Sequence, residues 1–193
     1  MTSIQESTQG LLGGIVSSGR ELGLQVTVYH HGELVVDAWA GCDDATSALP
    51  VDGDTLFTVY SAGKGVTATA VHILVEQGKL DYDDPITRFW PEFAQHGKDG
   101  VLVRHALAHT AGLPHMPPGY GQYDVTDWSL MCDLIAGSPP LYPPGETIAY
   151  HAMTYGWLVG GLAERADGRP FARIVTEEIA DPLGLNGLLQ AFR

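Results

Sequence analysis

The order of elements along the chain predicts an α+β fold in which an N-terminal helix and antiparallel strands precede a mostly helical domain. Three observations support this prediction. Apolar residues alternate on both sides of His30-His31-Gly32, which is typical of a β-hairpin. A helical period with a glycine stop follows over residues 65–78. From residue 81 onward the sequence consists of short helical stretches separated by Pro and Gly, so helices dominate the rest of the chain.

The N-terminal elements follow from the spacing of their apolar residues. Residues 4–22 have the period of an amphipathic helix, although three glycines weaken it. The two hairpin strands are expected at 24–29 and 33–39. A further short apolar strand is expected at 56–60, where it leads directly into the helix of residues 65–78.

The later part of the chain is predicted as short helices and two longer ones. Pro170 suits the first turn of the last helix, which Gly184 ends. The expected helices are 85–89, 101–108, 125–136, 154–166 and 171–179. We therefore expect a partial α/β domain at 1–80, a mostly helical domain at 81–180 and a short tail at 181–193.

Composition excludes several classes of partner. A net charge of −13 over 193 residues repels nucleic acid and anionic lipid, so neither is an expected partner. No apolar run reaches the ~18 residues of a membrane span. The first residues lack the basic and apolar regions of an export signal, and Cys42 and Cys132 are too few and too far apart for a disulfide framework. These features predict a cytoplasmic protein with reduced thiols.

Ser61 and Lys64 form the motif with the clearest chemistry. A Ser three residues before a Lys lies on the same face of a helix, so the hydroxyl and the amine can meet. The hydroxyl becomes a nucleophile when a neighbouring base takes its proton, and a lysine among apolar groups can act as that base. On its own the motif is weak, because a Ser N-cap with an ordinary surface Lys would give the same spacing.

Five segments, the first of which contains this motif, raise its specificity. Together they resemble the serine β-lactamase superfamily, especially the class C-like branch that contains family VIII carboxylesterases, D-amino-acid peptidases and penicillin-binding-protein-like enzymes. The resemblance covers residues 20–185. Its segments are LFTVYSAGKG at 56–65, GKLDYDDP at 78–85, VRHALAHTAGL at 103–113, PPGETIAY followed by HAMTYG at 143–156, and DPLGL at 181–185.

The resemblance implies roles for three residues. Ser61 would be the acylated nucleophile, and its backbone N–H would donate to the oxyanion of the tetrahedral intermediate. Lys64 would bind the hydroxyl and take or relay its proton. Tyr150 would be the general base toward Ser61 and later the general acid toward the leaving group, since an adjacent Lys cation favours phenolate. By itself, Tyr150 would fit a core tyrosine at a strand end better than a catalytic one, and its place after the Pro-Gly turn favours the catalytic role.

The chain departs from the family pattern at two places. The family's Tyr-x-Asn motif here ends in His151 and Ala152, so the side chain that helps to bind an amide and orients the lysine is missing. His151 and Ala152 are candidate substrate-binding residues, and a core-satisfied histidine is the alternative for His151. The family's third motif, a Lys-Thr-Gly variant on a later strand, is not found. We therefore expect either a fragment completed by a C-terminal complement or a short form completed by self-association.

Other constellations are weaker. His105 and His109 have the spacing of a metal pair on a helix, but a third ligand does not accompany them. The acidic loop with Asp81, Asp83 and Asp84 lacks the pattern of a calcium loop. We expect no cofactor and no metal. The sequence thus predicts a serine hydrolase of small carboxylic esters; β-lactamase or D-peptidase activity, and an inactive or assembly-dependent binding protein, are the alternatives.

Overall fold

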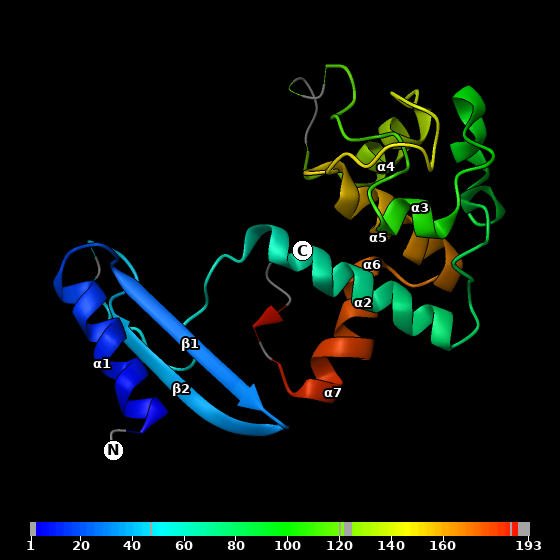
Figure 1. The fold of residues 1–193 in the computed structure, drawn as a ribbon. Helices are drawn as coiled ribbons and strands as arrows, with labels where there is room; N and C mark the ends of the chain where they lie inside the picture. Colours follow the sequence, from blue (N-terminus) through cyan, green and yellow to red (C-terminus); the bar gives the residue numbers. More distant parts are fainter. Residues whose placement is uncertain (1–2, 47, 120, 122–124, 186, 189–193) are drawn as a thin grey trace. The chain divides into compact units, whose positions relative to one another are not determined.

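The computed structural model describes residues 3–46, 48–119, 121, 125–185 and 187–188, which form two compact units, one up to Thr58 and one from Val59 onward (Figure 1). The division lies earlier than the boundary expected after residue 80, because helix α2 (Gly63–Glu76) packs on helices of the second unit. Within the described ranges, no helix combines the length and the apolar character needed to cross a bilayer.

The first unit is a β-hairpin with one helix packed on it. Strands β1 (Gly23–His30) and β2 (Glu33–Gly41) pair in antiparallel register, as the alternation predicted. His31 and Gly32 form the two-residue turn with φ values of 51° and 81°, the left-handed geometry that matches strand twist. Helix α1 (Ile4–Ser17) is shorter than expected and packs Leu12 against β2.

Side chains of α1 cover the outer backbone edge of β2. The Gln5 amide donates to Asp37 O and accepts from Asp37 N–H, both at 2.8 Å. One turn later, Gln9 Nε2 donates to Trp39 O at 2.7 Å. These bonds occupy backbone groups that could otherwise pair with another strand. The outer edge of β2 is therefore partly covered.

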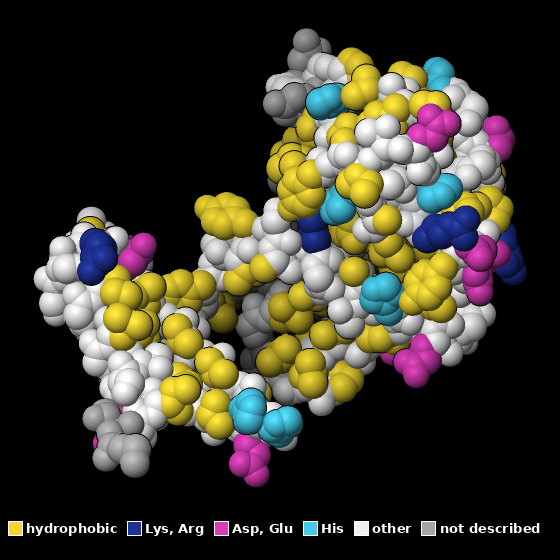
Figure 2. Space-filling model, viewed as in Figure 1, with side chains coloured by type: hydrophobic (Ala, Val, Ile, Leu, Met, Phe, Trp, Pro, Cys, Tyr) yellow, Lys and Arg dark blue, Asp and Glu magenta, His cyan; other side chains and the backbone are white. Residues whose placement is uncertain are grey.

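The far end of the hairpin keeps apolar side chains in solvent. Val28, Tyr29 and Leu34 are 40%, 65% and 51% exposed. Figure 2 shows hydrophobic side chains following the hairpin on the face in view, up to the histidines of its turn. Exposed apolar groups of this size on neighbouring strands are typical of a surface that another polypeptide covers.

The short strand expected at 56–60 is wrong. Residues 55–59 have no regular secondary structure, and the sheet of the described residues contains β1 and β2 only. A strand forms only where a neighbour supplies backbone hydrogen bonds, and this apolar segment has none along it. Its side chains Leu56, Phe57 and Val59 are exposed instead.

The second unit packs its helices around α2 and α5 (Thr154–Asp167). All the helices expected from the sequence are present, with one irregularity: the last one passes through a π-helical turn before it ends at Gly184. The remaining elements are η2 (Ile86–Arg88), η3 (Pro91–Gly97), α3 (Val103–Leu107), α4 (Trp128–Gly137), α6 (Phe171–Val175), the π-helix η5 (Thr176–Ala180) and α7 (Asp181–Leu183). Residues 186 and 189–193 of the expected tail lie outside the described part of the chain.

Two adjacent glycines let α5 approach its neighbours closely. A Cβ on Gly160 would lie 2.8 Å from the ring of Trp128 and 3.1 Å from that of Phe171. A Cβ on Gly161 would lie 2.9 Å from Cys132 Sγ. The absence of side chains at these two positions therefore sets the distance between α5 and α4, which carries Trp128 and Cys132.

A buried lysine joins η3 to the end of α4. Lys98 is fully buried, and its ammonium donates to Gln95 O at 2.8 Å, Ala136 O at 2.8 Å and Ser138 O at 2.6 Å. Burial lowers the pKa of Lys98 to about 8. The three N–H donors of the ammonium match the three carbonyls, so the charged form satisfies every group at this position.

Candidate active site

Ser61 is presented on a tight turn at the start of the second unit. It lies in the 3₁₀-helix η1 (Tyr60–Ala62), which continues directly into α2. Tyr60, immediately before it, has a φ of 45° and is 86% exposed. A non-glycine residue in the left-handed region is strained, and such strain is typical of functional turns. The turn leaves the Ser61 side chain exposed at the N-terminal end of the helix.

Lys64 lies in the first turn of α2, on the same face as Ser61. Its ammonium donates to Ser61 Oγ at 3.0 Å and to the backbone oxygen of Ala152 at 2.7 Å. The same nitrogen is 5.0 Å from the ring centroid of Tyr150 and 5.9 Å from that of Tyr155. These contacts hold the ammonium between the Ser61 hydroxyl and two aromatic faces, where a cation–π attraction adds to the hydrogen bonds.

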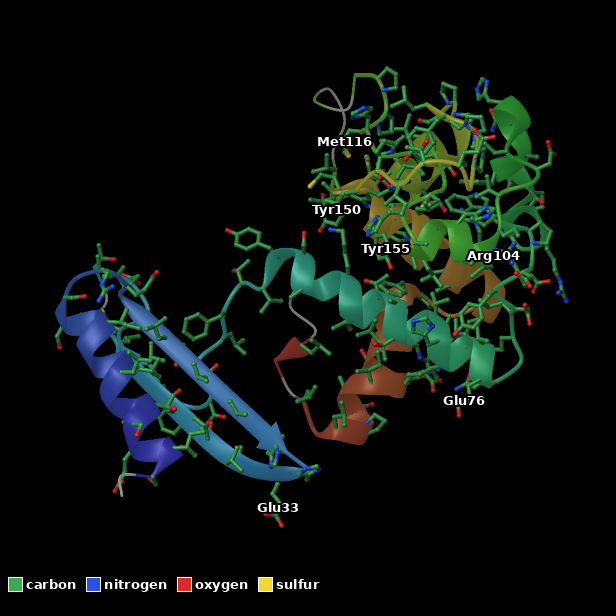
Figure 3. All side chains as sticks on the ribbon, viewed as in Figure 1. Glu33, Glu76, Arg104, Met116, Tyr150 and Tyr155 are labelled. Atoms are coloured by element: carbon green, nitrogen blue, oxygen red, sulfur yellow. The ribbon has the colours of Figure 1, made fainter. Side chains whose placement is uncertain are left out.

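Tyr150 completes the cluster. Hydrogen bonding lowers the pKa of its hydroxyl below the ordinary value; the bond to Ser61 has the larger effect and the bond to Lys64 the next. The side chain is 54% exposed. Figure 3 shows Tyr150 beside the N-terminal end of α2. A lowered pKa means that the phenol forms a phenolate more readily. A phenolate beside a hydroxyl and an ammonium is suited to accept the proton of that hydroxyl.

His109 holds the segment that carries Tyr150. Its carbonyl accepts from Ala149 N–H at 3.1 Å, and its Nδ1 accepts from His151 N–H at 3.1 Å. Its ring lies 4.9 Å from the Tyr150 ring and 4.8 Å from the Tyr155 ring, centroid to centroid. In the sequence, His109 had the spacing of a metal pair with His105 and lay in the segment 103–113 that resembles the family. Neither feature indicated its hydrogen bonds to Ala149 and His151, because those residues are about forty positions away.

His151 does not face a substrate. Its side chain is fully buried, Nε2 accepts from Leu113 N–H at 3.1 Å, and Nδ1 donates to Ala149 O at 2.6 Å. Burial lowers the pKa of His151, and a ring nitrogen that accepts from Leu113 N–H belongs to the neutral imidazole. The substrate-binding assignment is corrected: His151 is the core-satisfied histidine that was its alternative, since both ring nitrogens are used by backbone groups.

Ala152 takes part through its backbone. Its methyl group is exposed, and its carbonyl is one of the two acceptors of the Lys64 ammonium. Alanine at this position predicts that Lys64 loses an orienting partner, because alanine has no polar side chain. The backbone oxygen supplies that partner instead, so the orientation of Lys64 does not depend on the side chain of residue 152.

The other sequence candidates are engaged elsewhere. His105 Nδ1 accepts from Leu102 N–H at 3.2 Å. In the acidic loop, Asp83 pairs with Arg104, and Asp84 pairs with Arg88. No cluster of three metal-ligating side chains occurs among residues whose positions are described.

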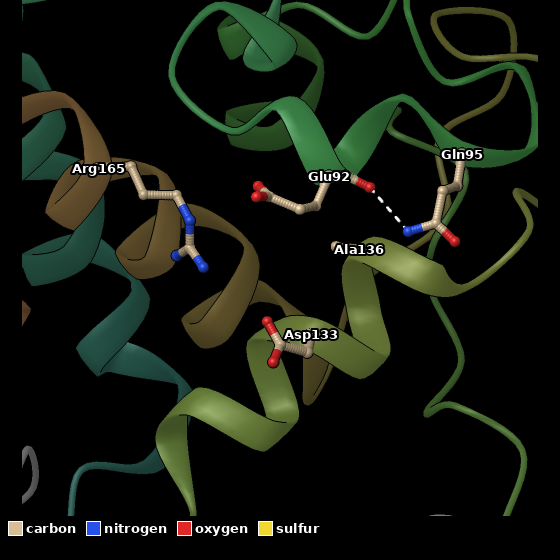
Figure 4. A pocket seen from close by; sticks show the side chains of 5 residues that line it. All are labelled: Glu92, Gln95, Asp133, Ala136 and Arg165. Carbon is tan, nitrogen blue, oxygen red and sulfur yellow. Dashed lines mark hydrogen bonds between the residues drawn. The ribbon is translucent and has the colours of Figure 1, made fainter.

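A separate hollow lies between η3, α4 and α5. It has a volume of about 430 Å³ and is lined by Glu92, Gln95, Asp133, Ala136 and Arg165. Figure 4 shows the two carboxylates and the guanidinium directed into this region. The Arg165 guanidinium lies 4.0 Å from the centroid of the Trp90 ring and donates to Gly161 O. The lining residues include no hydroxyl or thiol, so this hollow holds no counterpart of Ser61.

Comparison with known proteins gives a consistent result. The family model described as Beta-lactamase matches residues 8–188. The chain is 39% identical to the esterase/beta-lactamase LipL of Mycobacterium tuberculosis over 84% of the chain and 38% of that protein. It is 33% identical to the esterase EstB of Burkholderia gladioli over 86% of the chain and 46% of that protein.

Solved structures agree with the sequence matches. The crystal structure of a family VIII carboxylesterase superposes with a TM-score of 0.84 and 33% identity, over 93% of the chain and 49% of that structure. The chain therefore spans less than half the length of these relatives, although nearly all of it is matched.

Proposed function

Because the chain belongs to the Beta-lactamase family, we propose that it is a serine hydrolase that cleaves small carboxylic esters through an acyl intermediate on Ser61. The observation that carries the proposal is the 3.0 Å hydrogen bond from Lys64 Nζ to Ser61 Oγ beside Tyr150, whose pKa is lowered by the same two residues. The printed names of LipL and EstB, an esterase/beta-lactamase and an esterase, support the substrate class.

Acylation follows from the directions of these hydrogen bonds. Lys64 donates to Ser61 Oγ, so the hydroxyl proton is directed toward Tyr150. As Oγ attacks the ester carbonyl carbon, the proton moves to the phenolate oxygen of Tyr150. The carbonyl oxygen becomes an oxyanion, for which the Ser61 backbone N–H is the proposed donor. Collapse of the tetrahedral intermediate breaks the C–O bond, and Tyr150 returns the proton to the departing alkoxide.

Deacylation uses the same groups in reverse. Water loses a proton to Tyr150 as its oxygen attacks the acyl carbon, and the second tetrahedral intermediate then releases Ser61 Oγ. Tyr150 returns the proton to that oxygen, and a carboxylic acid leaves. Lys64 is held by Ala152 O at 2.7 Å in both half-reactions, and a cation beside Tyr150 favours its phenolate form.

Ester chemistry is favoured over amide chemistry at this site. Ala152 and the buried His151 leave no side-chain amide or imidazole directed to a substrate amide within the described residues. Hydrolysis of a β-lactam or of a D-amino-acid peptide is the second candidate. The name of LipL, which includes both activities, supports keeping it.

Turnover of two chromogenic substrates separates these candidates. We expect the wild-type chain to hydrolyse p-nitrophenyl acetate and butyrate, and Ser61→Ala to lose that activity. Nitrocefin hydrolysis that depends on Ser61 would instead support the β-lactamase candidate. The absence of both activities, with no covalent adduct from a fluorophosphonate, would support a third candidate, an inactive or assembly-dependent protein that acts by binding.

The proposal includes a larger assembly. The chain spans less than half the length of its relatives, and Val28, Tyr29 and Leu34 expose apolar side chains on the hairpin. We propose that a second copy or a C-terminal complement covers this surface. Light scattering during gel filtration tests whether a second copy is bound. A fully active 20.7 kDa monomer would contradict both the second copy and the C-terminal complement.

A further inference from the structure

We propose that His109 is a positioning residue that holds Tyr150 against Ser61 and Lys64 while its imidazole is neutral, and that protonation of this imidazole releases Tyr150 and turns the site off in acid. This inference rests on the proposed function, because it concerns the group assigned there as the general base. His109 itself touches neither the substrate position nor Ser61 in the contacts of the described residues, so its action is indirect.

His109 binds the backbone on both sides of Tyr150. The carbonyl of His109 accepts from the N–H of Ala149, the residue before Tyr150. The Nδ1 atom of His109 accepts from the N–H of His151, the residue after Tyr150, and both distances are 3.1 Å. Tyr150 is 54% exposed, so packing alone leaves its side chain poorly restrained. One residue therefore supplies the two bonds that fix the backbone from which the phenol extends.

The ring of His109 also limits the positions open to the phenol. Its centroid lies 4.9 Å from that of Tyr150 and 4.8 Å from that of Tyr155, with interplanar angles of 54° and 37°. Tyr155 is nearly fully buried in α5 and gives this small stack a rigid base. The Tyr150 ring is thus held between the imidazole on one side and the Lys64 ammonium, 5.0 Å from its centroid.

The backbone at His109 is strained, as expected for a residue that positions another side chain. Its φ is 61°, a left-handed value that is unfavourable for a non-glycine residue. Glycine would remove that strain but would also remove the ring acceptor. Asparagine tolerates the left-handed region better than most residues and carries a side-chain oxygen that can accept from His151 N–H.

The neutral form of His109 is favoured by its surroundings. Burial lowers its pKa from the ordinary value, and the Lys64 cation lowers it further. The groups that face it are Lys64 from α2, Tyr150 and His151 from the segment it holds, and Tyr155 from α5. None of these is an acidic group that would stabilise an imidazolium.

Protonation has a direct structural consequence. An imidazolium carries N–H on both ring nitrogens, so Nδ1 could no longer accept from His151 N–H. Two N–H donors would then face each other, and a second positive charge would stand near Lys64. The segment of Tyr150 would lose one of its two hydrogen bonds to His109, and the hydroxyl of Ser61 would lose its proton acceptor.

Two substitutions separate the acceptor from the backbone conformation. His109→Gly allows the left-handed backbone and removes the acceptor, whereas His109→Asn retains both. We expect His109→Gly to lower kcat for p-nitrophenyl acetate at least about tenfold with little change in KM, since small displacements of catalytic groups have effects of this size or larger. His109→Asn is expected to recover most of that loss. Its activity should fall less steeply in acid than that of the wild type, because only the titration of Tyr150 and not that of residue 109 then contributes.

Titration of Tyr150 gives a readout that does not depend on turnover. In chains labelled with tyrosine carrying ¹³C at Cζ, the Tyr150 signal is identified by its absence in Tyr150→Phe. We expect its pKa to rise toward the ordinary tyrosine value in His109→Gly and to stay lowered in His109→Asn. Equal titrations in wild type and His109→Gly, or an equal rise in both variants, would overturn the positioning role.

The two proposals fail in different ways. If the wild-type chain hydrolyses no ester, the proposed function fails, while the Tyr150 titration still decides whether His109 positions the phenol. If the wild type is active and His109→Asn keeps the same acid limb as the wild type, the switch fails and the proposed function stands. His151 is present in every variant, so its own titration cannot produce the difference.

Discussion

The ammonium of Lys64 donates to the backbone oxygen of Ala152 at 2.7 Å, a bond between residues 88 positions apart in the sequence. The same nitrogen donates to Ser61 Oγ at 3.0 Å. A backbone carbonyl thus does for the lysine what a side-chain amide does in the related Tyr-x-Asn motif. The bond fixes the ammonium where it can act on both the nucleophile and Tyr150.

This arrangement predicts opposite outcomes for two substitutions. Lys64→Met removes the ammonium and should lower the rate of ester hydrolysis at least ~10²-fold, the usual scale for an acid–base group. Ala152→Ser leaves the carbonyl in place and should change the rate by less than about threefold. Steady-state kinetics with p-nitrophenyl butyrate measures both.

Lys79→Met is the matched control for Lys64→Met, because it removes the same charge from a lysine that pairs with Asp167 away from the cluster. A rate in Lys64→Met close to that of Lys79→Met would remove Lys64 from the mechanism. A large loss in Ala152→Ser would show that the side chain at position 152 matters after all.

Tyr150→Phe tests the proposed general base. The substitution keeps the ring and its contact with His109 but removes the hydroxyl that bonds to Ser61 and Lys64. We expect at least ~10²-fold lower kcat with thermal stability unchanged, since the side chain is more than half exposed. Tyr82→Phe, which removes a hydroxyl that bonds to His72 Nδ1 away from the cluster, is the control for the loss of one phenol. Activity equal to that of the control would contradict the assignment.

Stability should fall as the pH is lowered from 7 toward 5. Burial lowers the pKa of His105, His109 and His151 in the folded chain, so below about pH 6.5 the unfolded chain binds more protons than the folded one. Stability is then fully present above that pH and is lost as the pH falls through the window. Urea unfolding at several pH values measures the slope.

The carboxylates contribute in a lower window. The pKa of Asp167 is lowered to about 2 by Arg169 and Lys79, so its contribution is lost only below about pH 4. His109→Asn removes one of the three titrating groups and should reduce the slope between pH 7 and 5. An unfolding free energy independent of pH in this range would contradict the lowered pKa values of these three histidines.

The two substitutions Gly160→Ala and Gly156→Ala test the packing of α5. A methyl group at Gly160 would meet the rings of Trp128 and Phe171, so we expect destabilisation of about 1–3 kcal/mol. At Gly156 on the same helix nothing lies within 4 Å of the added carbon, and alanine should stabilise the helix by about 0.5–1 kcal/mol. Thermal unfolding compares them. Equal effects would mean that the close approach of the helices is not limiting.

Local pattern accounts for much of this fold. The alternation around His30-His31-Gly32 predicted the hairpin and its turn, and the helices of the second unit lie where their periods place them. The strand at 56–60 was wrong because strand pairing depends on a partner that no local pattern reveals. The division of the chain after Thr58 was missed for a similar reason. Helix α2 belongs to the second unit because it packs on α5 and α6, and its position in the sequence does not reveal that packing.

The candidate site shows the same limit. The spacing of Ser61 and Lys64 and the motif around Tyr150 indicated three residues that the structure places in contact. The backbone oxygen that orients Lys64 and the two bonds from His109 had no counterpart in the sequence. Both involve main-chain atoms brought together over long separations, and the residue type at the acceptor position carries no information about them.

The central claim is that Ser61 is the nucleophile, and covalent labelling tests it most directly. The intact mass of the chain is measured after incubation with a fluorophosphonate, followed by peptide mapping, in wild type and in Ser61→Ala. We predict one adduct per wild-type chain, located on Ser61, and none in Ser61→Ala. An unmodified wild-type chain, or an adduct of equal yield in Ser61→Ala, would contradict the account.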